Sequence, residues 1–388
     1  MSFDRLTEFP WTGTGTPVYC NAASTGPLPA RTRVLLDQWS ALRAEPWRIT
    51  LEDQFGALRT GRECCAALIG ADADEIALVP NTSTGINIAA QILPVRAGQT
   101  ILGHDGEFPA HVYPWMARAR ATGATFEQLP LRDDGLPDWD AVPERLARGD
   151  VAVLAVSWVS FVSGDRADLA TLGALCRKHG VRFAVDGIQG VGVVPLDVHA
   201  CQIDVLACGA QKWLLSPWGS GFCYVRRELV TQSEPLMVGW LAMQGSEDFS
   251  RMLDYDFTYY DDARRFEVAT IPYQDMAGMN ESLGLLNEIG LAEVSRSITS
   301  LAARLVDGVA NLDGVTRVTP RDANRRAGIV SVRVSDAARV SRALDDAHVV
   351  HSLRGRGVIR FSPHIYNTAE EMDRIVEVLG SAASAARG

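Results

Sequence analysis

Short apolar runs alternate with amphipathic stretches between residues 76 and 226, and this rhythm predicts a parallel sheet covered by helices. Most of the runs are continuously apolar, as expected for strands buried on both faces. Seven of them are predicted strands: 76–80, 100–104, 125–131, 151–159, 182–187, 204–209 and 221–226. We therefore expect an α/β fold with a mostly parallel seven-stranded sheet flanked by helices.

The pattern changes after residue 255. A long helical stretch precedes two short apolar strands and a closing helix, at 276–309, 328–334, 357–363 and 368–386. This order is typical of a smaller α+β domain. We expect residues 1–20 to form an N-terminal segment that packs with the small domain. Residues 21–255 would form the large domain and residues 256–388 the small domain.

Charge and composition narrow the class of protein. The formal net charge is −10, which argues against a nucleic-acid or anionic membrane surface. No apolar run is long enough to span a bilayer, and the first eleven residues lack the features of a signal peptide. The seven cysteines have no metal-ligand spacing, so we expect reduced, mostly buried thiols and no metal site. A cytoplasmic protein is the resulting expectation.

An acid closes one predicted strand, and a lysine follows the next. Asp186 ends the run in "VRFAVDGIQ", and Lys212 stands in "GAQKWLL". Parallel strands bring both to the carboxyl edge of the sheet, where ligands bind. This pair suits pyridoxal phosphate (PLP), because a lysine amine forms a Schiff base with its aldehyde and a carboxylate keeps its pyridine nitrogen protonated. A lone lysine before an apolar run is usually a snorkelling surface residue, so the inference depends on the pair.

A polar turn between a strand and a helix supplies a candidate phosphate site. In "LVPNTSTGIN", Thr82 and Ser83 offer hydroxyls and backbone N–H groups at a helix N-terminus, where the dipole favours an anion. An ordinary N-cap is the alternative, but a cap requires only one hydroxyl. The run 81–85 is richer than that, which favours a phosphate site.

Segments spread along nearly the whole chain resemble one family, the fold-type I PLP enzymes of the aminotransferase class V branch. This branch includes cysteine desulfurases, kynureninase-like lyases and isopenicillin epimerase-like proteins. The segments are "VYCNAAST", "NTSTGIN", "HDGEFPAHVYPW", "VSWVSFVSGDRADL", "VDGIQ", "GAQKWLLSPWGSG", "RRFEVATIP" and "GVIRFSPHIYNTAEEMDRIV". The resemblance implies PLP as cofactor, an α-amino acid as substrate, and a homodimer with shared active sites.

The same resemblance implies a role for each matching residue. Lys212 would be the Schiff-base partner and would move the proton of the substrate Cα. Asp186 would contact the pyridine nitrogen of the cofactor, Gln189 its phenolic oxygen and Phe108 its ring face. The phosphate would be bound by Thr82, Ser83 and Gln211, and the phosphate in the partner subunit by Thr270. Arg360, with Arg354 second, would bind the substrate carboxylate, since a guanidinium donates two parallel hydrogen bonds to it. A solvated ion-pair arginine is the alternative for either.

Three positions depart from the family pattern. Desulfurases carry a nucleophilic cysteine shortly before the carboxylate-binding arginine, whereas this chain has no cysteine after Cys223. A persulfide-forming desulfurase is therefore not expected. Phe161 stands where many relatives have an asparagine, so either Ser160 takes over near the phenolic oxygen or the electronic tuning differs. Gln211 replaces a common histidine, which removes one acid–base group.

The sequence thus predicts a PLP-dependent enzyme acting on an α-amino acid, with an aminotransferase as the preferred reaction. A C–S or C–C lyase, or an epimerase, of the same family is the alternative. A catalytically idle PLP-fold scaffold is the alternative from another class. A nucleotide-binding oxidoreductase is set aside because no G-x-G-x-x-G turn follows a first strand.

Overall fold

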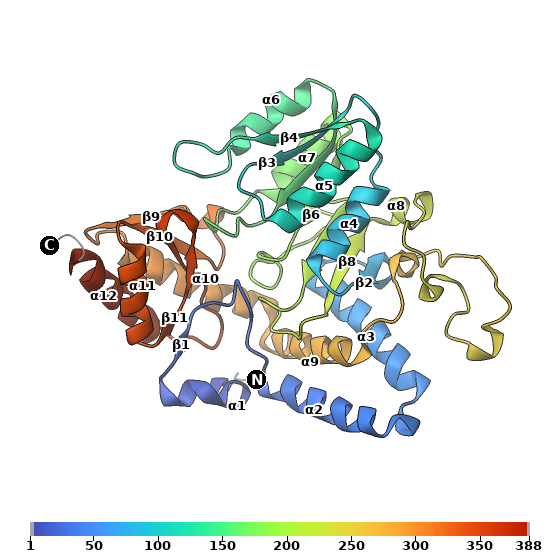
Figure 1. Ribbon diagram of the computed structural model, residues 1–388, viewed down its shortest axis with the longest axis horizontal. Helices are drawn as coiled ribbons and strands as arrows, with labels where there is room; N and C mark the ends of the chain where they lie inside the picture. Colours follow the sequence, from blue (N-terminus) through green and yellow to red (C-terminus); the bar gives the residue numbers. More distant parts are fainter. Residues whose placement is uncertain (1–3, 386–388) are drawn as a thin grey trace.

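A seven-stranded sheet forms the centre of the computed structural model, which describes residues 4–385 (Figure 1). Its strand order is β2-β8-β7-β6-β5-β3-β4. The strands are β2 (Ile76–Leu78), β3 (Thr100–His104), β4 (Thr125–Leu129), β5 (Val151–Ser157), β6 (Arg182–Asp186), β7 (Val205–Gly209) and β8 (Gly221–Val225). β3 to β7 pair in parallel, while β8 is antiparallel to β2 and β7. The predicted strands and mostly parallel sheet are confirmed.

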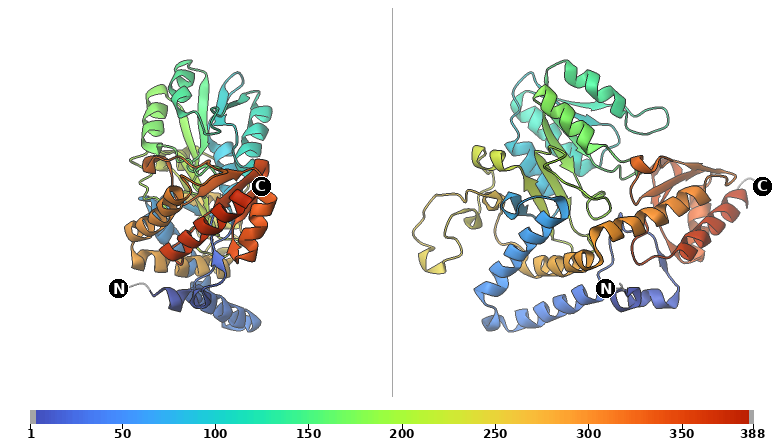
Figure 2. Two further views of the ribbon diagram at one scale, coloured as in Figure 1. Left: turned by 90° about the vertical axis from the view of Figure 1, so that its left-hand side faces the viewer. Right: turned by 180° about the vertical axis from the view of Figure 1, so that it is seen from behind.

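Helices cover both faces of this sheet, as the edge-on view of Figure 2 shows. Two separate groups of buried apolar side chains fill the spaces above and below it, which explains the continuously apolar strands. The α-helices between residues 30 and 289 are α2 (Ala30–Ala44), α3 (Leu51–Ile69), α4 (Thr82–Ile92), α5 (Pro109–Thr122), α6 (Val142–Ala147), α7 (Leu169–His179), α8 (Arg227–Gln232) and α9 (Tyr273–Ile289). Within residues 4–385, no helix is both long and apolar enough to cross a membrane.

A smaller antiparallel sheet lies beside the large one, with strand order β12-β13-β10-β9. Its strands are β9 (Val315–Arg317), β10 (Val330–Val334), β12 (Ser352–Arg354) and β13 (Val358–Phe361). Its helices are α10 (Leu291–Gly308), α11 (Ala337–Asp346) and α12 (Ala369–Ala385). The beginning of the chain joins this region after the short helix α1 (Arg5–Glu8), because β1 (Val18–Tyr19) pairs in parallel with β11 (Val349–Val350).

The long helical stretch predicted over 276–309 is two helices in the structure. Gly290 separates α9 from α10 and has a φ of 91°, outside the helical range. The two helices then take different neighbours: α9 packs against α2 and α3, whereas α10 packs against α12. The expected division of the chain at residues 255 and 256 stays a prediction.

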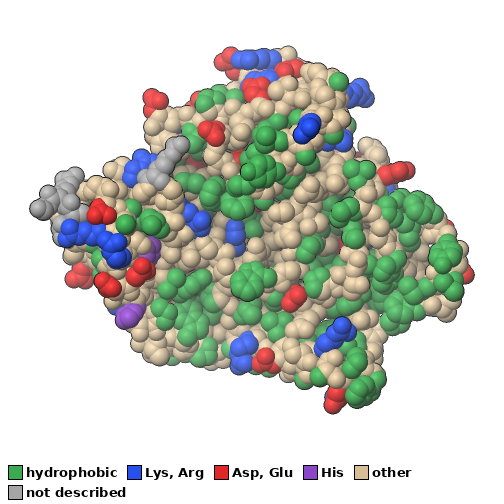
Figure 3. Space-filling view, in the orientation of Figure 1, with side chains coloured by type: hydrophobic (Ala, Val, Ile, Leu, Met, Phe, Trp, Pro, Cys, Tyr) green, Lys and Arg blue, Asp and Glu red, His purple; other side chains and the backbone are tan. Residues whose placement is uncertain are grey.

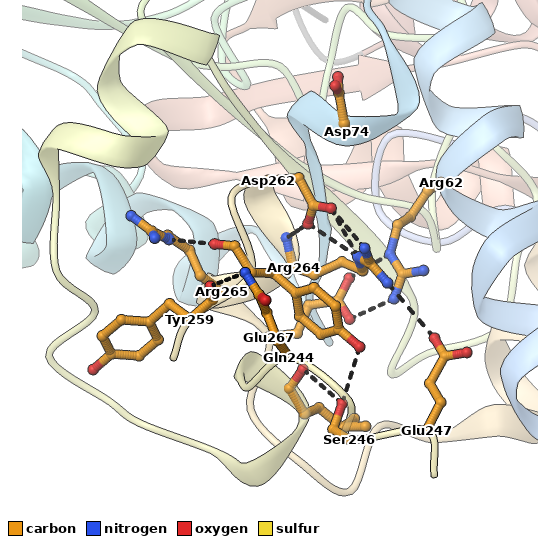
Figure 4. Close-up of polar contacts among 12 residues, drawn as sticks. Arg62, Asp74, Gln244, Ser246, Glu247, Tyr259, Asp262, Arg264, Arg265 and Glu267 are labelled. Atoms are coloured by element: carbon orange, nitrogen blue, oxygen red, sulfur yellow. Dashed lines mark hydrogen bonds and ion pairs between the residues drawn. The ribbon is translucent and has the colours of Figure 1, made fainter. Parts of the chain in front are cut away.

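An irregular excursion of the chain over residues 233–262 extends from the body of the molecule (Figure 1). Polar contacts hold its base (Figure 4): the guanidinium of Arg264 pairs with Asp262 at 2.7 Å and lies 3.6 Å from Glu247. Next to this base, Arg62 and Glu267 form a buried ion pair, with 2.7 Å between Nη2 and Oε2. The tip, in contrast, exposes large apolar side chains, which Figure 3 shows gathered over this side of the molecule.

Candidate functional site

The sheet topology brings Asp186 and Lys212 to the same edge. Asp186 is the last residue of β6, and Lys212 lies three residues after the end of β7, the parallel neighbour of β6. Each group alters the ionisation of the other, since the carboxylate raises the pKa of the lysine and the lysine lowers that of the acid. The two residues on which the sequence inference depends are therefore within electrostatic reach of each other.

The amine of Lys212 is buried among groups that favour its neutral form. Burial lowers its pKa from the ordinary value to about 8, against the opposing effect of Asp186. The positive charges of Arg360 and Arg354 lower this pKa further. The Phe108 ring covers the approach, with 5.9 Å between its centroid and Nζ. At pH 7 about a tenth of the amine is thus uncharged, far more than for a lysine with the ordinary pKa, and this fraction can act as a nucleophile or a base.

Asp186 is buried within electrostatic reach of a second acid, Glu107. Burial raises the pKa of its carboxyl group, while the electrostatic effect of nearby His111 and the hydrogen bond that Ile188 N donates at 3.0 Å lower it. Glu107 lies in the same region, and its Oε1 accepts a hydrogen bond from Ser157 N at 2.7 Å. Glu107 and His111 were not among the predicted site residues, although both stand in the quoted segment "HDGEFPAHVYPW" close to Phe108.

The residues predicted to hold phosphate converge at the start of α4. Asn81 is the N-cap, since its Oδ1 accepts a hydrogen bond from Thr84 N at 2.9 Å, so the hydroxyls of Thr82 and Ser83 are not used as the cap. Thr82 Oγ1 accepts a hydrogen bond from Gly209 N at 2.8 Å. A Cβ added at Gly209 would lie 2.5 Å from Gln211 Oε1 and 3.2 Å from Thr82 Oγ1. Only a glycine leaves this polar cradle open, which fits a phosphate group.

Arg360 lies in β13 with its side chain 1% exposed. Its Nη1 donates to Phe161 O at 2.7 Å and its Nη2 to Ser24 Oγ at 2.8 Å. Burial and the nearby Arg354 lower the pKa of this guanidinium to about 9. Among residues 4–385, neither arginine forms an ion pair with a carboxylate. Arg360 is therefore a buried cation without a counter-ion, as a carboxylate-binding residue would be.

The remaining predicted site residues are Gln189, Ser160 and Thr270, and their surroundings differ. The amide of Gln189 is engaged on both sides: Trp213 Nε1 donates to its Oε1 at 2.8 Å, and its Nε2 donates to Ala23 O at 3.1 Å. Ser160 Oγ accepts a hydrogen bond from Ser163 N at 3.2 Å and lines a cavity beside the site. Thr270 is exposed on the segment before α9. Their contacts with a cofactor stay predictions.

A short loop over residues 21–26, most of it quoted above within "VYCNAAST" but given no role there, completes the site. It carries Ser24, the shared acceptor of both arginines. Gly26 N donates to Gln211 O at 2.8 Å, and a Cβ added at Gly26 would lie only 2.1 Å from Lys212 O. The small residues in "NAASTG" were the available signal, because the backbone must pass this close to Lys212.

Metal ligands are not gathered anywhere in the part of the chain that the structure describes: no three His, Cys, Asp or Glu side chains come together to hold an ion. All seven cysteines are free thiols, and five of them are buried. Burial raises the pKa of Cys208, the cysteine whose charge most affects Lys212, well above that of an ordinary thiol. Its thiol is therefore protonated at neutral pH.

Comparisons with known proteins agree with this geometry. The model of the Aminotransferase class-V family matches residues 21–375. An uncharacterized aminotransferase of Bacillus subtilis is 26% identical over 352 residues, covering 90% of each chain. A probable cysteine desulfurase of Mycobacterium leprae is 29% identical over 350 residues, covering 84% of this chain and 81% of that one. The solved structure of an apo cysteine desulfurase from Thermococcus onnurineus has a TM-score of 0.87 at 24% identity over 98% of each chain, a likeness of fold.

The lowered pKa of Lys212 predicts how the apoprotein reacts with an aldehyde. The rate of PLP incorporation should rise with pH and level off above about 8, because only the neutral amine attacks. Stopped-flow absorbance over a pH series measures this. Lys178 and Lys212 are the only lysines of the chain, so a Lys178→Arg variant is the matched control and should give the same profile. A midpoint near the ordinary lysine value of about 10.4 would contradict the assignment.

Proposed function

Because the chain belongs to the aminotransferase class-V family of PLP-dependent enzymes, we propose that it acts on an α-amino acid with Lys212 as the catalytic base. One observation supports this most directly. The amine of Lys212, with a pKa of about 8, is within electrostatic reach of both the Asp186 carboxylate and the Arg360 guanidinium. These are the groups needed for the cofactor ring, the reacting carbon and the substrate carboxylate.

The polar groups at the edge of the sheet fit PLP. Asp186 would pair with the pyridine nitrogen, and the cradle at Gly209 would hold the phosphate through Thr82, Ser83 and Gln211. Further contacts would come from Phe108 on the ring face, and from Gln189 and Ser160 at the phenolic oxygen. When bound, PLP supplies an aldehyde that holds the amine and a ring that withdraws electrons.

The residues of the chain then have defined tasks. Arg360 binds the substrate carboxylate through parallel hydrogen bonds and fixes the orientation of the Cα–H bond. The neutral amine of Lys212 removes the proton from Cα and can then donate it to a different carbon. A base with a pKa near the working pH is efficient both in accepting and in donating a proton. The ring of Phe108, whose centroid lies 5.9 Å from Lys212 Nζ, would cover one face of the cofactor ring.

Transamination is the outcome that we propose. It is supported by the Bacillus subtilis relative, which is named an aminotransferase. Elimination by a C–S lyase is the second candidate, supported by the name of the Mycobacterium leprae relative. A desulfurase that forms a persulfide on its own cysteine is opposed by the absence of any cysteine after Cys223. An idle scaffold has no need of a buried amine and a buried guanidinium held together, because burying such cations costs free energy.

We also propose a homodimer. The exposed apolar side chains of Leu236 and Met237 line a cavity of about 380 Å³ together with Ser83, beside the proposed phosphate turn. An apolar surface of this kind is typical of a protein–protein interface. A partner subunit seated there would bring Thr270 towards the neighbouring site, as the resemblance implies.

Replacing the lysine tests the cofactor assignment. The Lys212→Ala variant should keep its fold, measured by circular dichroism, and should yield no cofactor peptide after borohydride reduction and mass spectrometry. A Lys178→Arg variant should give the same labelled peptide as the wild-type protein, because Lys178 is exposed and lies on α7. A reduced adduct on Lys178 in the wild-type protein would contradict the proposal.

Incubation with and without a keto acid tests the reaction. Purified holoenzyme should convert amino acids to 2-oxo acids only when an acceptor such as 2-oxoglutarate is present, with equal amounts of new amino acid formed. Chromatography of both products measures this. Product formed without any acceptor would exclude simple transamination and favour the lyase.

The mass of the holoenzyme tests the dimer. Analytical ultracentrifugation should give twice the chain mass of 42.1 kDa. Met237→Asp should shift the equilibrium towards the monomer by placing a charge on the apolar surface, whereas the same change at exposed Met116 on α5 serves as the control. A monomeric wild-type protein would remove the proposed role of Thr270.

A further inference from the structure

Arg354 and Arg360 present two guanidinium groups to a single hydroxyl. Ser24 Oγ accepts a hydrogen bond from Arg360 Nη2 at 2.8 Å and from Arg354 Nη2 at 3.1 Å. The Nε atoms of both arginines are buried and have no hydrogen-bond partner. A neutral hydroxyl cannot balance two positive charges held this close, so the pair carries an excess of positive charge.

The acidic groups near this pair do not balance it. Asp105 and Glu107 line the same cavity as Arg354, but each is committed elsewhere. Asp105 is exposed and accepts a hydrogen bond from Gly106 N at 2.8 Å. Glu107 has both carboxylate oxygens hydrogen-bonded to Ser157. Within residues 4–385, no carboxylate forms an ion pair with either arginine.

One substrate carboxylate brings a single negative charge, whereas the two arginines carry two positive charges. Arg360 is almost fully buried beside Lys212, so its position suits the α-carboxylate, which must lie next to the reacting carbon. Arg354 is less buried and also lines a cavity of about 470 Å³. After the α-carboxylate is bound, Arg354 still offers a positive charge to this cavity.

We propose that Arg354 binds a second anion, the side-chain carboxylate of an acidic α-amino acid such as glutamate or aspartate. This inference rests on the proposed function, because it assumes that the α-carboxylate occupies Arg360. The opposite charges attract strongly in a site shielded from water, and the guanidinium can donate two parallel hydrogen bonds. The substrate class is thereby narrowed from any α-amino acid to acidic ones.

Apart from Asp105 and Glu107, the walls of the cavity agree with a side chain that is apolar along its length and charged at its end. Trp139, Leu131 and Pro137 supply apolar surface, and Ser160 supplies a hydroxyl. His104 packs edge-on against Trp139 with 4.3 Å between the ring centroids. Burial lowers the pKa of this histidine to about 4, so it adds no positive charge at neutral pH. Arg354 is then the cation of this cavity wall.

Pairs of amino acids that differ only in charge test the inference. Isothermal titration calorimetry of the PLP-loaded protein should show glutamate binding about ten- to a hundredfold more tightly than glutamine, and aspartate more tightly than asparagine. In an Arg354→Met variant this ratio should fall to about one, and Arg354→Lys should retain part of it. Arg360→Met should instead weaken acid and amide alike, since both carry the α-carboxylate.

The possible outcomes distinguish a failure of the inference about Arg354 from a failure of the proposed function. Equal affinities within both pairs in the wild-type protein would overturn the inference, as would a charge preference that survives in Arg354→Met. If none of the four ligands binds while borohydride still traps the cofactor on Lys212, the inference fails and the cofactor site stands. If no cofactor is trapped on Lys212, the proposed function fails instead. Cofactor content measured on every variant shows that each has folded.

Discussion

The gathering of three basic side chains at a largely buried edge of the sheet is the constraint on which the site depends. Arg354 and Arg360 both lower the pKa of Lys212, and Arg354 also lowers that of Arg360, whereas Asp186 opposes them only at Lys212. Desolvated charges cost several kcal/mol each when they are not paired. The lysine avoids part of this cost by giving up its proton, which its lowered pKa reflects. The arginines cannot do so at neutral pH, and therefore the site is left with a strong affinity for anions.

This constraint links the cofactor, the substrate and the stability of the fold. A phosphate in the cradle at Gly209 and carboxylates on the arginines would each bring negative charge to the same edge of the sheet. Ligands that bind only the folded state stabilise it in proportion to their affinity. The two apolar cores and the helices that cover both faces of the sheet offset the cost of the site in the absence of ligands.

The sequence was sufficient for those features that depend on local pattern. Continuously apolar runs such as 151–159 and 204–209 predicted the central sheet, and the rule that ligands bind at the carboxyl edge then brought Asp186 and Lys212 together. Local pattern failed where a single residue changed the backbone. Gly290 stands inside an amphipathic stretch that reads as one helix, and only its positive φ shows that the chain turns there.

Contacts between distant parts of the chain were also beyond the sequence. Nothing near Ser24 indicates that it accepts hydrogen bonds from two arginines, and the partners of Gln189 come from two other segments. The separation of Ser24 from Arg360 by 336 residues has a consequence for biosynthesis. The loop that carries Ser24 is synthesised before the strand that carries Arg360, so their hydrogen bond forms only after all strands of the central sheet have left the ribosome.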